Sequence, residues 1–278
     1  TQDDDVAPTE SVTNQQALSH DGEWARGVVL PASIYALFEN AFRARHGWSI
    51  DEHRDRLAAL YAGFNEVAVA NPHAWIREPW TAAEIRDPSP RNRMVGFPYT
   101  KVMNANNAVE QAACFVVTSV GQARDLGISS DRWVFPWSGT DAHEHWYVSH
   151  RASLGRAPAI GIAGRAALRL AEVDVDDLAH IDVYSCFPSA VHIAAHELGL
   201  DIERPLTVTG GLSFADSAGF EITGDGAYER LVATRFGSGQ PPRLLDGWGN
   251  EVASSATAAL SAGGVIEGFA MFIMSGSV

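Results

Sequence analysis

Residues 180–200 combine the pattern of a strand and the pattern of a helix in one continuous stretch. The segment HIDVYSCFPSAVHIAAHELGL starts with apolar residues, turns at the small polar pair Ser185 and Cys186, and continues with helical spacing after Pro188. A strand followed at once by a helix is typical of α/β folds. In open α/β sheets, ligands bind at the carboxyl ends of the strands, where the next helix also offers free N–H groups. The corner at residues 184–187 is therefore the first candidate site.

The chain from residue 104 onward continues this alternation. Short apolar runs with aromatic or β-branched residues predict strands, and longer runs with apolar residues at helical spacing predict helices. Strands that alternate with helices favour a largely parallel sheet. Strands are expected at 132–139, at 205–211 and at 263–274, the last as one strand or a pair, and helices at 156–173 and 189–200.

The earlier part of the chain carries helix signals instead. Apolar residues recur at helical spacing after Pro31, a residue that the first turn of a helix tolerates. A second helix is expected from Ser49, an N-cap residue with Glu52 three positions later, to Asn71, which precedes a proline. Prolines recur between residues 72 and 90 and leave that segment mostly irregular, with one short helix.

These patterns divide the chain into three parts. Residues 1–24 are polar, rich in Asp, Gln, Thr and Ser, and lack apolar periodicity, which predicts a polar tail or loop. Residues 25–103 form a small helical module, and residues 104–278 form an α/β domain.

The charge and the cysteine content exclude several classes of partner. With 20 basic and 34 acidic residues the net charge is −14, and such a chain repels phosphate backbones and anionic lipid surfaces. No apolar run approaches the roughly 20 residues that cross a bilayer, and the polar start is unlike a secretory signal. The two cysteines, Cys114 and Cys186, cannot form a disulfide framework. We expect a cytoplasmic protein without nucleic-acid or membrane partners.

Two histidine groups raise the alternative of a metal site. His192 and His196 are four residues apart, but Ile193 stands where a zinc protease has its glutamate. His143 and His145 would share one face of a strand, in an aromatic setting that favours a solvated loop or the wall of a substrate channel. We therefore expect no metal.

Several stretches resemble, in their order and spacing, the C-terminal half of the thiolase superfamily. The resemblance is greatest to sterol-carrier-protein-type thiolases and actinobacterial thiolase-like proteins. It implies a mixed sheet flanked by helices, with residues 25–103 as the loop domain that thiolases insert for coenzyme A. The stretches are NANNAVEQAACFVVTSVGQARDLGI at 104–128, DDLAHIDVYSCFPSAVHIAAHELGL at 176–200, LTVTGGLSFA at 206–215, more weakly ALSAGGVIEGFAMFIM at 259–274, and YALFENAFRARHG at 35–47 for the loop domain.

The resemblance implies a reaction at an acyl-CoA thioester in lipid metabolism, such as acyl transfer of the acetyl-CoA acetyltransferase kind. In thiolases a cysteine of the N-terminal half accepts the acyl group, and an oxyanion hole stabilises the thioester oxygen. Residues 1–24 are too few to hold that half. We therefore expect the chain alone to be inactive, and a second chain, or a homo-oligomer, to complete it. Coenzyme A enters as part of the substrate, and no separate cofactor is implied.

Four residues are the catalytic candidates. Tyr184 stands where the family has Asn or His, and a phenol can donate a hydrogen bond to an oxyanion. Cys186 lies at the start of a helix, which can lower the pKa of a thiol, although a buried cysteine is more often a small packing residue. Ser217 is nearest to the expected histidine of the Gly-His-Pro motif, and Ser261 replaces the cysteine of the final hairpin.

The remaining candidates are expected to bind substrate. They belong to the motif turns, or they are cations that suit the coenzyme's phosphates, with solvated surface charges as the alternative for the cations. Two other functions stay open: an aldolase-type lyase that cleaves a carbon–carbon bond of a hydroxyacyl-CoA, with Tyr184 as acid or base, and a non-catalytic acyl-CoA-binding or assembly subunit. The binding candidates are Asn104, Asn106, Asn107, Gly210, Gly211, Arg93 and Lys101.

Overall fold

The computed structural model describes residue 17, residues 19–106 and residues 116–215, together with the backbone of three short strands further on. The helices are α1 (Asp21–Trp24), α2 (Pro31–His46), α3 (Ile50–Ala70), α4 (Ala82–Arg86), α5 (Val120–Asp125), α6 (Pro158–Ala171), α7 (Pro188–Leu198) and α8 (Gly211–Phe214). The strands are β1 (Met94–Gly96), β2 (Tyr99–Thr100), β3 (Val134–Thr140), β4 (Leu244–Leu245), β5 (Glu251–Val252) and β6 (Met271–Gly276).

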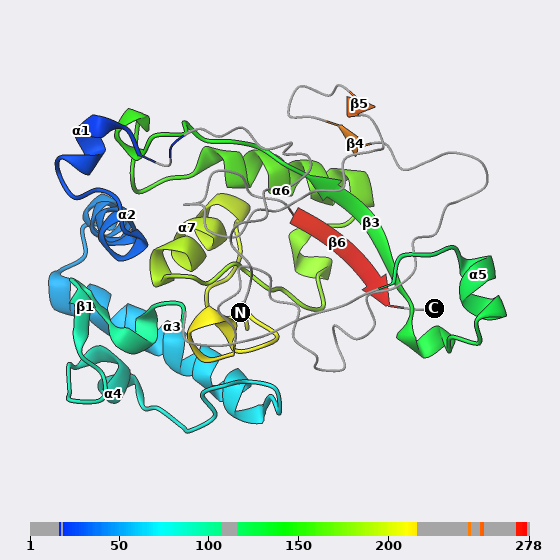
Figure 1. The fold of residues 1–278 in the computed structure, drawn as a ribbon, viewed down its shortest axis with the longest axis horizontal. Coiled ribbons are helices and arrows are strands. Elements are labelled where there is room, and N and C mark those ends of the chain that lie inside the picture. Colours follow the sequence, from blue (N-terminus) through cyan, green and yellow to red (C-terminus); the bar gives the residue numbers. More distant parts are fainter. Residues whose placement is uncertain are drawn as a thin grey trace, which may run out of the picture.

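The helical module lies on one side of the molecule and the strand pair β3–β6 on the other (Figure 1). Helix α7 lies between them, because it packs against α2 of the module and against α6, which in turn packs on β3. Most of the buried apolar residues of α2, α3 and α7 belong to one continuous core. The corner at 184–187 immediately precedes α7, so it lies where the module meets the α/β part of the chain.

The two long helices of the module begin and end at the residues that the sequence predicts. Pro31 is in the first turn of α2, which ends at Gly47 in a left-handed conformation with φ of 68°. The Ser49 hydroxyl caps α3 by accepting the Glu52 N–H at 3.2 Å, and Asn71 ends that helix. The predictions for these helices are therefore confirmed.

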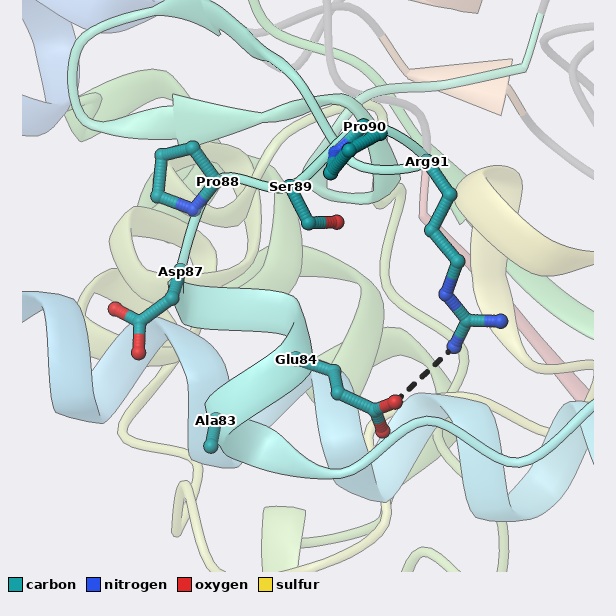
Figure 2. A pocket seen from close by; sticks show the side chains of 7 residues that line it. All are labelled: Ala83, Glu84, Asp87, Pro88, Ser89, Pro90 and Arg91. Carbon is teal, nitrogen blue, oxygen red and sulfur yellow. Dashed lines mark hydrogen bonds and ion pairs between the residues drawn. The ribbon is translucent and has the colours of Figure 1, made fainter.

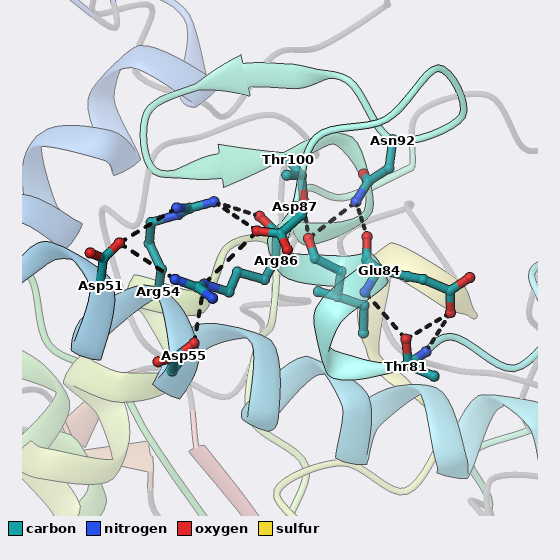
Figure 3. Close-up of polar contacts among 10 residues, drawn as sticks. Asp51, Arg54, Asp55, Thr81, Glu84, Arg86, Asp87, Asn92 and Thr100 are labelled. Carbon is teal, nitrogen blue, oxygen red and sulfur yellow. Dashed lines mark hydrogen bonds and ion pairs between the residues drawn. The ribbon is translucent and has the colours of Figure 1, made fainter.

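Helix α4 is fixed to α3 and to the β1–β2 hairpin by polar contacts (Figure 3). The Arg54 guanidinium donates to the carbonyl of Arg86 at 2.9 Å. On the hairpin side, the Thr100 hydroxyl donates to the carbonyl of Ile85 at 2.6 Å, and the Asn92 side chain donates to the same carbonyl at 3.1 Å. The exposed ion pairs in this cluster add little individually, so the buried bonds to main-chain carbonyls define the contact.

Helices α6 and α7 are joined by a partly buried ion pair. The Arg156 guanidinium donates to both carboxylate oxygens of Glu197, at 2.8 Å for Nη2 and Oε2, and the Ala157 N–H donates to the same carboxylate at 3.1 Å. The Glu197 side chain is 4% exposed. Burial alone would raise the pKa of Glu197, but the hydrogen bonds from Arg156 and Ala157 outweigh it, so the net pKa is lowered.

Glu197→Ala is expected to lower the free energy of unfolding by about 2 kcal/mol, because it leaves the buried Ala157 N–H without its acceptor. Urea unfolding followed by circular dichroism measures the loss. Glu203→Ala is the control, since Glu203 is exposed and its replacement should change stability by at most about 0.5 kcal/mol. Equal losses in the two variants would show that the ion pair is not stabilising.

The structure confirms the predicted strand at 132–139 as β3 and the predicted helices at 156–173 and 189–200 as α6 and α7. Two other predicted strands are absent. Residues 180–185 and 205–211 lie side by side through the Val183 N–H and the Leu206 carbonyl, 3.0 Å apart, but neither forms a regular strand. Side chains bind the neighbouring main-chain groups instead: Thr207 accepts from two N–H groups, and Asp182 accepts from the Val208 N–H at 3.2 Å. Such local bonds replace the bonds of a ladder.

The described strand pairings are also all antiparallel, where the alternation favours a largely parallel sheet. Strand β3 pairs with β6 from Val134 opposite Gly276 to Thr140 opposite Met271. Strand β6 begins within the predicted 263–274 strand region and ends two residues beyond it. Within the ranges that the structure describes, no helix is long and apolar enough to cross a membrane.

The predicted polar tail is described only at its end. Residues Asp21–Trp24 form the short helix α1, and Glu23 within it is 3% exposed. Its carboxylate accepts the Ser149 N–H at 2.8 Å, and Trp146 donates to the carbonyl of Ala17 at 2.7 Å. This end of the segment is therefore attached to the 3₁₀ turn at Val148–His150 and to the loop before it.

Candidate functional site

Three of the motif segments meet at the corner that precedes α7. The Ala105 N–H donates to the carbonyl of Cys186, and the Asn106 N–H donates to the carbonyl of Leu212, both at 3.0 Å. The Leu212 N–H in turn donates to the Ser185 hydroxyl at 3.1 Å. Segments that are far apart in the sequence thus share one set of main-chain bonds, and we call their meeting point, residues 184–187, the corner.

The corner presents one half-buried phenol beside a buried thiol. Tyr184 packs against the edge of the core, whereas Cys186 is only 4% exposed. Burial raises the pKa of the Cys186 thiol to about 12, and it outweighs the lowering by the neighbouring Tyr35 and Tyr184 phenols. The effect of burial is larger than any lowering by the helix N-terminus. The thiol is therefore protonated at neutral pH.

The main chain of the corner is held from below by α3. The Tyr61 hydroxyl, which is fully buried, donates to the carbonyl of Ser185 at 3.1 Å. Ser185 and Ser189 are themselves fully buried. The corner therefore forms part of the packed contact between the helical module and α7.

Gly210 and Gly211 form a tight turn at a close approach to α3. Both have left-handed conformations, with φ of 107° and 75°. A Cβ atom on Gly210 would lie 2.4 Å from the Cβ of Ala68, and one on Gly211 would lie 2.8 Å from the hydroxyl of Ser185. The structure accounts for both glycines by packing, and their role in binding substrate stays a prediction.

Three of the other binding candidates are grouped at the base of the β1–β2 hairpin. Arg93 and Lys101 are exposed and adjacent, since the Lys101 N–H donates to the carbonyl of Arg93 at 2.9 Å. The Asn104 side chain donates to the carbonyl of Thr100 at 2.6 Å, so its amide holds the chain as it leaves the hairpin. These residues lead directly into the bonds that Ala105 makes to the corner.

Some candidates lie outside the described residues, and the structure does not address them. These are Asn107, Cys114, Ser217 and Ser261. Among the described residues, no group of three or more His, Cys, Asp or Glu side chains is arranged to hold a metal ion. His143 and Asp141 form an exposed pair at 3.3 Å, and His192 stacks on Phe42 at 5.6 Å between ring centres.

A buried polar cluster next to the corner is the feature that the sequence analysis missed. Glu39 of α2 is 0% exposed; it accepts a hydrogen bond from the Tyr99 hydroxyl at 2.8 Å and lies 2.8 Å from Nε2 of His53. Nδ1 of His192 lies 3.7 Å from the same carboxylate. A glutamate on the same helix face as Tyr35, Phe38 and Phe42 was the available signal.

The electrostatics of this cluster favour a charged Glu39. Burial alone would raise the pKa of its carboxyl, but the nearby His192 ring and the hydrogen bond with His53 outweigh burial and lower the pKa to about 2. Burial also raises the pKa of Tyr99 well above its ordinary value, and the charge of Glu39 adds to that effect. The Tyr99 phenol is therefore a permanent donor at physiological pH.

One hollow lies away from the corner, between α4 and the loop that follows it (Figure 2). It has a volume of about 550 Å³, and the Arg91–Glu84 ion pair of 3.3 Å lies at its side. A second hollow of about 20 Å³, enough for one water, is lined in part by Tyr35. Neither of these two hollows is lined by Tyr184 or Cys186.

Comparisons with known proteins identify relatives but no matching family model. The chain is 25% identical over 215 residues to the acetyl-CoA acetyltransferase of Methanothermobacter thermautotrophicus, which covers 77% of this chain and 51% of that protein. It is 32% identical to the crystal structure of a monomeric SCP2-thiolase like protein type 1 from Mycobacterium smegmatis, with a TM-score of 0.63 over 72% of this chain and 44% of that one.

A third similarity concerns the fold alone. The Ltp2-ChsH2(DUF35) aldolase matches with a TM-score of 0.58 and 16% identity, over 74% of this chain and 57% of that one. The chain thus spans about half the length of the relatives that it matches. Three of the segments that resemble thiolases meet at the corner, and one solved relative is described as SCP2-thiolase like. The chain therefore has a thiolase-like α/β fold and is similar to members of the thiolase superfamily.

Proposed function

We propose that the chain acts on acyl-CoA thioesters as part of a thiolase-type acyltransferase, and that the corner contacts the thioester carbonyl. The convergence of the segments around Ala105, Cys186 and Leu212 is the observation that supports this most. The names of two relatives, an acetyl-CoA acetyltransferase and an SCP2-thiolase like protein, support the same class of reaction. Coenzyme A enters as part of the substrate, without a separate cofactor, and a cytoplasmic location stays our expectation.

Tyr184 is the residue that we assign to the thioester oxygen. Its phenol is half-buried at the corner and can donate a hydrogen bond to the negative charge that develops there. The N-terminus of α7, an 11-residue helix, favours negative charge at the same place. Cys186, with its pKa of about 12, serves in this proposal as a neutral hydrogen-bonding partner of Tyr184.

The nucleophilic cysteine comes from elsewhere in this proposal. The relatives are about twice as long as the aligned region, and the resemblance to thiolases implies that the nucleophile belongs to an N-terminal half that these residues do not resemble. A second chain or a longer form of this chain would supply that half, and a homo-oligomer is the other possible assembly. Ser217 and Ser261 keep the proton-transfer positions that the resemblance gives them, as part of the proposal.

The coenzyme is assigned to the hairpin side of the corner. Arg93 and Lys101 are exposed cations that lie next to each other and suit phosphate groups. The segment of Asn104 and Asn106 leads from these cations toward the corner, and the Gly210–Gly211 turn borders it. Asn107, which follows in the sequence, stays a binding candidate of the proposal. The thioester would thereby extend from the hairpin to Tyr184.

A carbon–carbon lyase of the aldolase kind is the second candidate. The observation that favours it is the pairing of a protonated thiol with a half-buried phenol, because a phenol serves acid–base chemistry whereas the thiol at this pKa is a poor nucleophile. In that reaction Tyr184 would move the proton as the carbon–carbon bond of a hydroxyacyl-CoA breaks.

The Tyr184→Phe variant tests the contact with the thioester. We expect the wild-type chain to bind acetyl-CoA more tightly than free coenzyme A, because only the thioester offers a carbonyl to the phenol. Loss of that hydrogen bond should remove most of the preference, a factor of about 5 to 10. Isothermal titration with each ligand measures it, and free coenzyme A is the control because its affinity should not change.

The outcomes distinguish the candidates. A wild-type chain that binds neither ligand would contradict the whole proposal. A preference for acetyl-CoA that persists in Tyr184→Phe would remove Tyr184 from the carbonyl. An acyl group found on Cys114 or Cys186 after incubation with acetyl-CoA, by mass spectrometry of their peptides, would contradict the assignment of the nucleophile to another half.

A further inference from the structure

The Tyr99 hydroxyl is the centre of a buried group that connects the helical module to α7. It lies 2.8 Å from Oε2 of Glu39, 2.9 Å from the Ser189 hydroxyl and 3.0 Å from the carbonyl of Tyr35. Glu39, Tyr99 and Ser189 are all 0% exposed, and Tyr35 is 2% exposed. These contacts are therefore shielded from bulk solvent, and each polar group depends on the others.

The direction of the hydrogen bonds follows from the number of protons. Tyr99 has one O–H, and the carboxylate of Glu39 can only accept. The Tyr99 O–H therefore donates its hydrogen bond to Glu39. The Ser189 hydroxyl is then left to donate, either to the Tyr99 oxygen at 2.9 Å or to the carbonyl of Tyr35 at 3.4 Å. These side chains therefore form a series of hydrogen bonds that ends at the carboxylate of Glu39.

Two of its members contact the corner directly. Ser189 lies in the first turn of α7, two residues beyond Phe187. The Tyr35 ring stacks on the Phe187 ring, with centres 4.4 Å apart and planes at 14°. Tyr35 therefore contacts the corner with its ring and Tyr99 with its main-chain carbonyl.

We infer that Glu39 and Tyr99 are positioning residues for the corner: they hold Ser189 and the main chain of Tyr35, and the Tyr35 ring in turn holds Phe187 next to Cys186. The inference rests on the proposed function, because it assigns these residues to the support of the segment that would contact the thioester. Glu39, Tyr35 and Tyr99 belong to the helical module, to which we also assign the coenzyme. Binding of the coenzyme and orientation of Tyr184 would thus depend on the same buried group.

Protection of Cys186 from alkylation tests the inference without a ligand. In the native wild-type protein, iodoacetamide should modify Cys186 at least 100-fold more slowly than in the urea-unfolded protein, as measured by mass spectrometry of its peptide. Tyr99→Phe removes only the hydroxyl and should raise the native rate at least 10-fold. Ser189→Ala, measured in the same way, serves if Tyr99→Phe does not fold.

Thr100→Val is the matched control. Thr100 neighbours Tyr99 in β2 and is equally buried, but its hydroxyl donates to Ile85 in α4 and has no contact with the corner. At temperatures equally far below the melting point of each variant, Thr100→Val should leave the rate at Cys186 within 2-fold of wild type. Equal acceleration in both variants, or none in Tyr99→Phe, would overturn the positioning role. Since alkylation needs no acyl-CoA, such a result is separate from a failure of acetyl-CoA to bind, which would count against the proposed function.

Discussion

Gly210→Ala is expected to destabilise the protein by about 3 kcal/mol or more, through overpacking and backbone strain together. The added Cβ would lie 2.4 Å from the Cβ of Ala68, 2.7 Å from its Cα and 2.8 Å from its N, so the main chain of α3 blocks it. The φ of 107° at Gly210 is also one that alanine rarely adopts. Urea unfolding followed by circular dichroism measures the free energy of unfolding.

Gly63→Ala is the control for this variant. Gly63 lies within α3 on its exposed side, and no atom lies within 4 Å of the Cβ that alanine would add. There the same substitution should raise stability by about 0.5 to 1 kcal/mol, because alanine is the better helix former. Two variants with similar stability would show that the turn at Gly210 can move away from α3, which would contradict the close packing described above.

Helix positions were predictable because their signals are local. Pro31, Ser49 and Gly47 act on residues within one turn of themselves, so a single stretch of sequence contains the whole cause. The same holds for α6 and α7, each of which starts with a proline in its first turn. The resemblance singled out these distant segments, but only the structure shows that they meet at the corner.

The missing strands and the buried cluster depend on contacts that the sequence does not display. The side chains of Thr207 and Asp182 accept hydrogen bonds from main-chain N–H groups, in place of the carbonyl groups of a neighbouring strand. Which acceptor an N–H group binds depends on how the two segments pack, and the sequence does not show this. Glu39 is a similar case. Its partners His53 and Tyr99 are 14 and 60 residues away, so a lone glutamate on an apolar helix face gives no sign of them.

Glu39→Gln is expected to lower the free energy of unfolding by about 3 kcal/mol at pH 7, because the buried partners of the carboxylate lose their anionic acceptor. The amide oxygen of Gln can accept from Tyr99 or from His53, and its NH₂ group then faces the other donor. Urea unfolding of both proteins measures the difference. Glu66→Gln, at an exposed position of α3, is the control and should change stability by at most about 0.5 kcal/mol.

The size of that difference should depend on pH in one direction. The pKa of Glu39 is about 2 in the folded protein and lies below the ordinary value of 4.5, so its contribution to stability is fully present above about pH 5. The contribution is lost as the pH falls from the ordinary value toward 2. Other carboxylates with lowered pKa values, such as Glu197, affect both proteins alike and cancel. The wild-type advantage should therefore shrink between pH 5 and pH 3, and an advantage that stays constant over that range would mean that Glu39 is not a buried carboxylate held by His53 and His192.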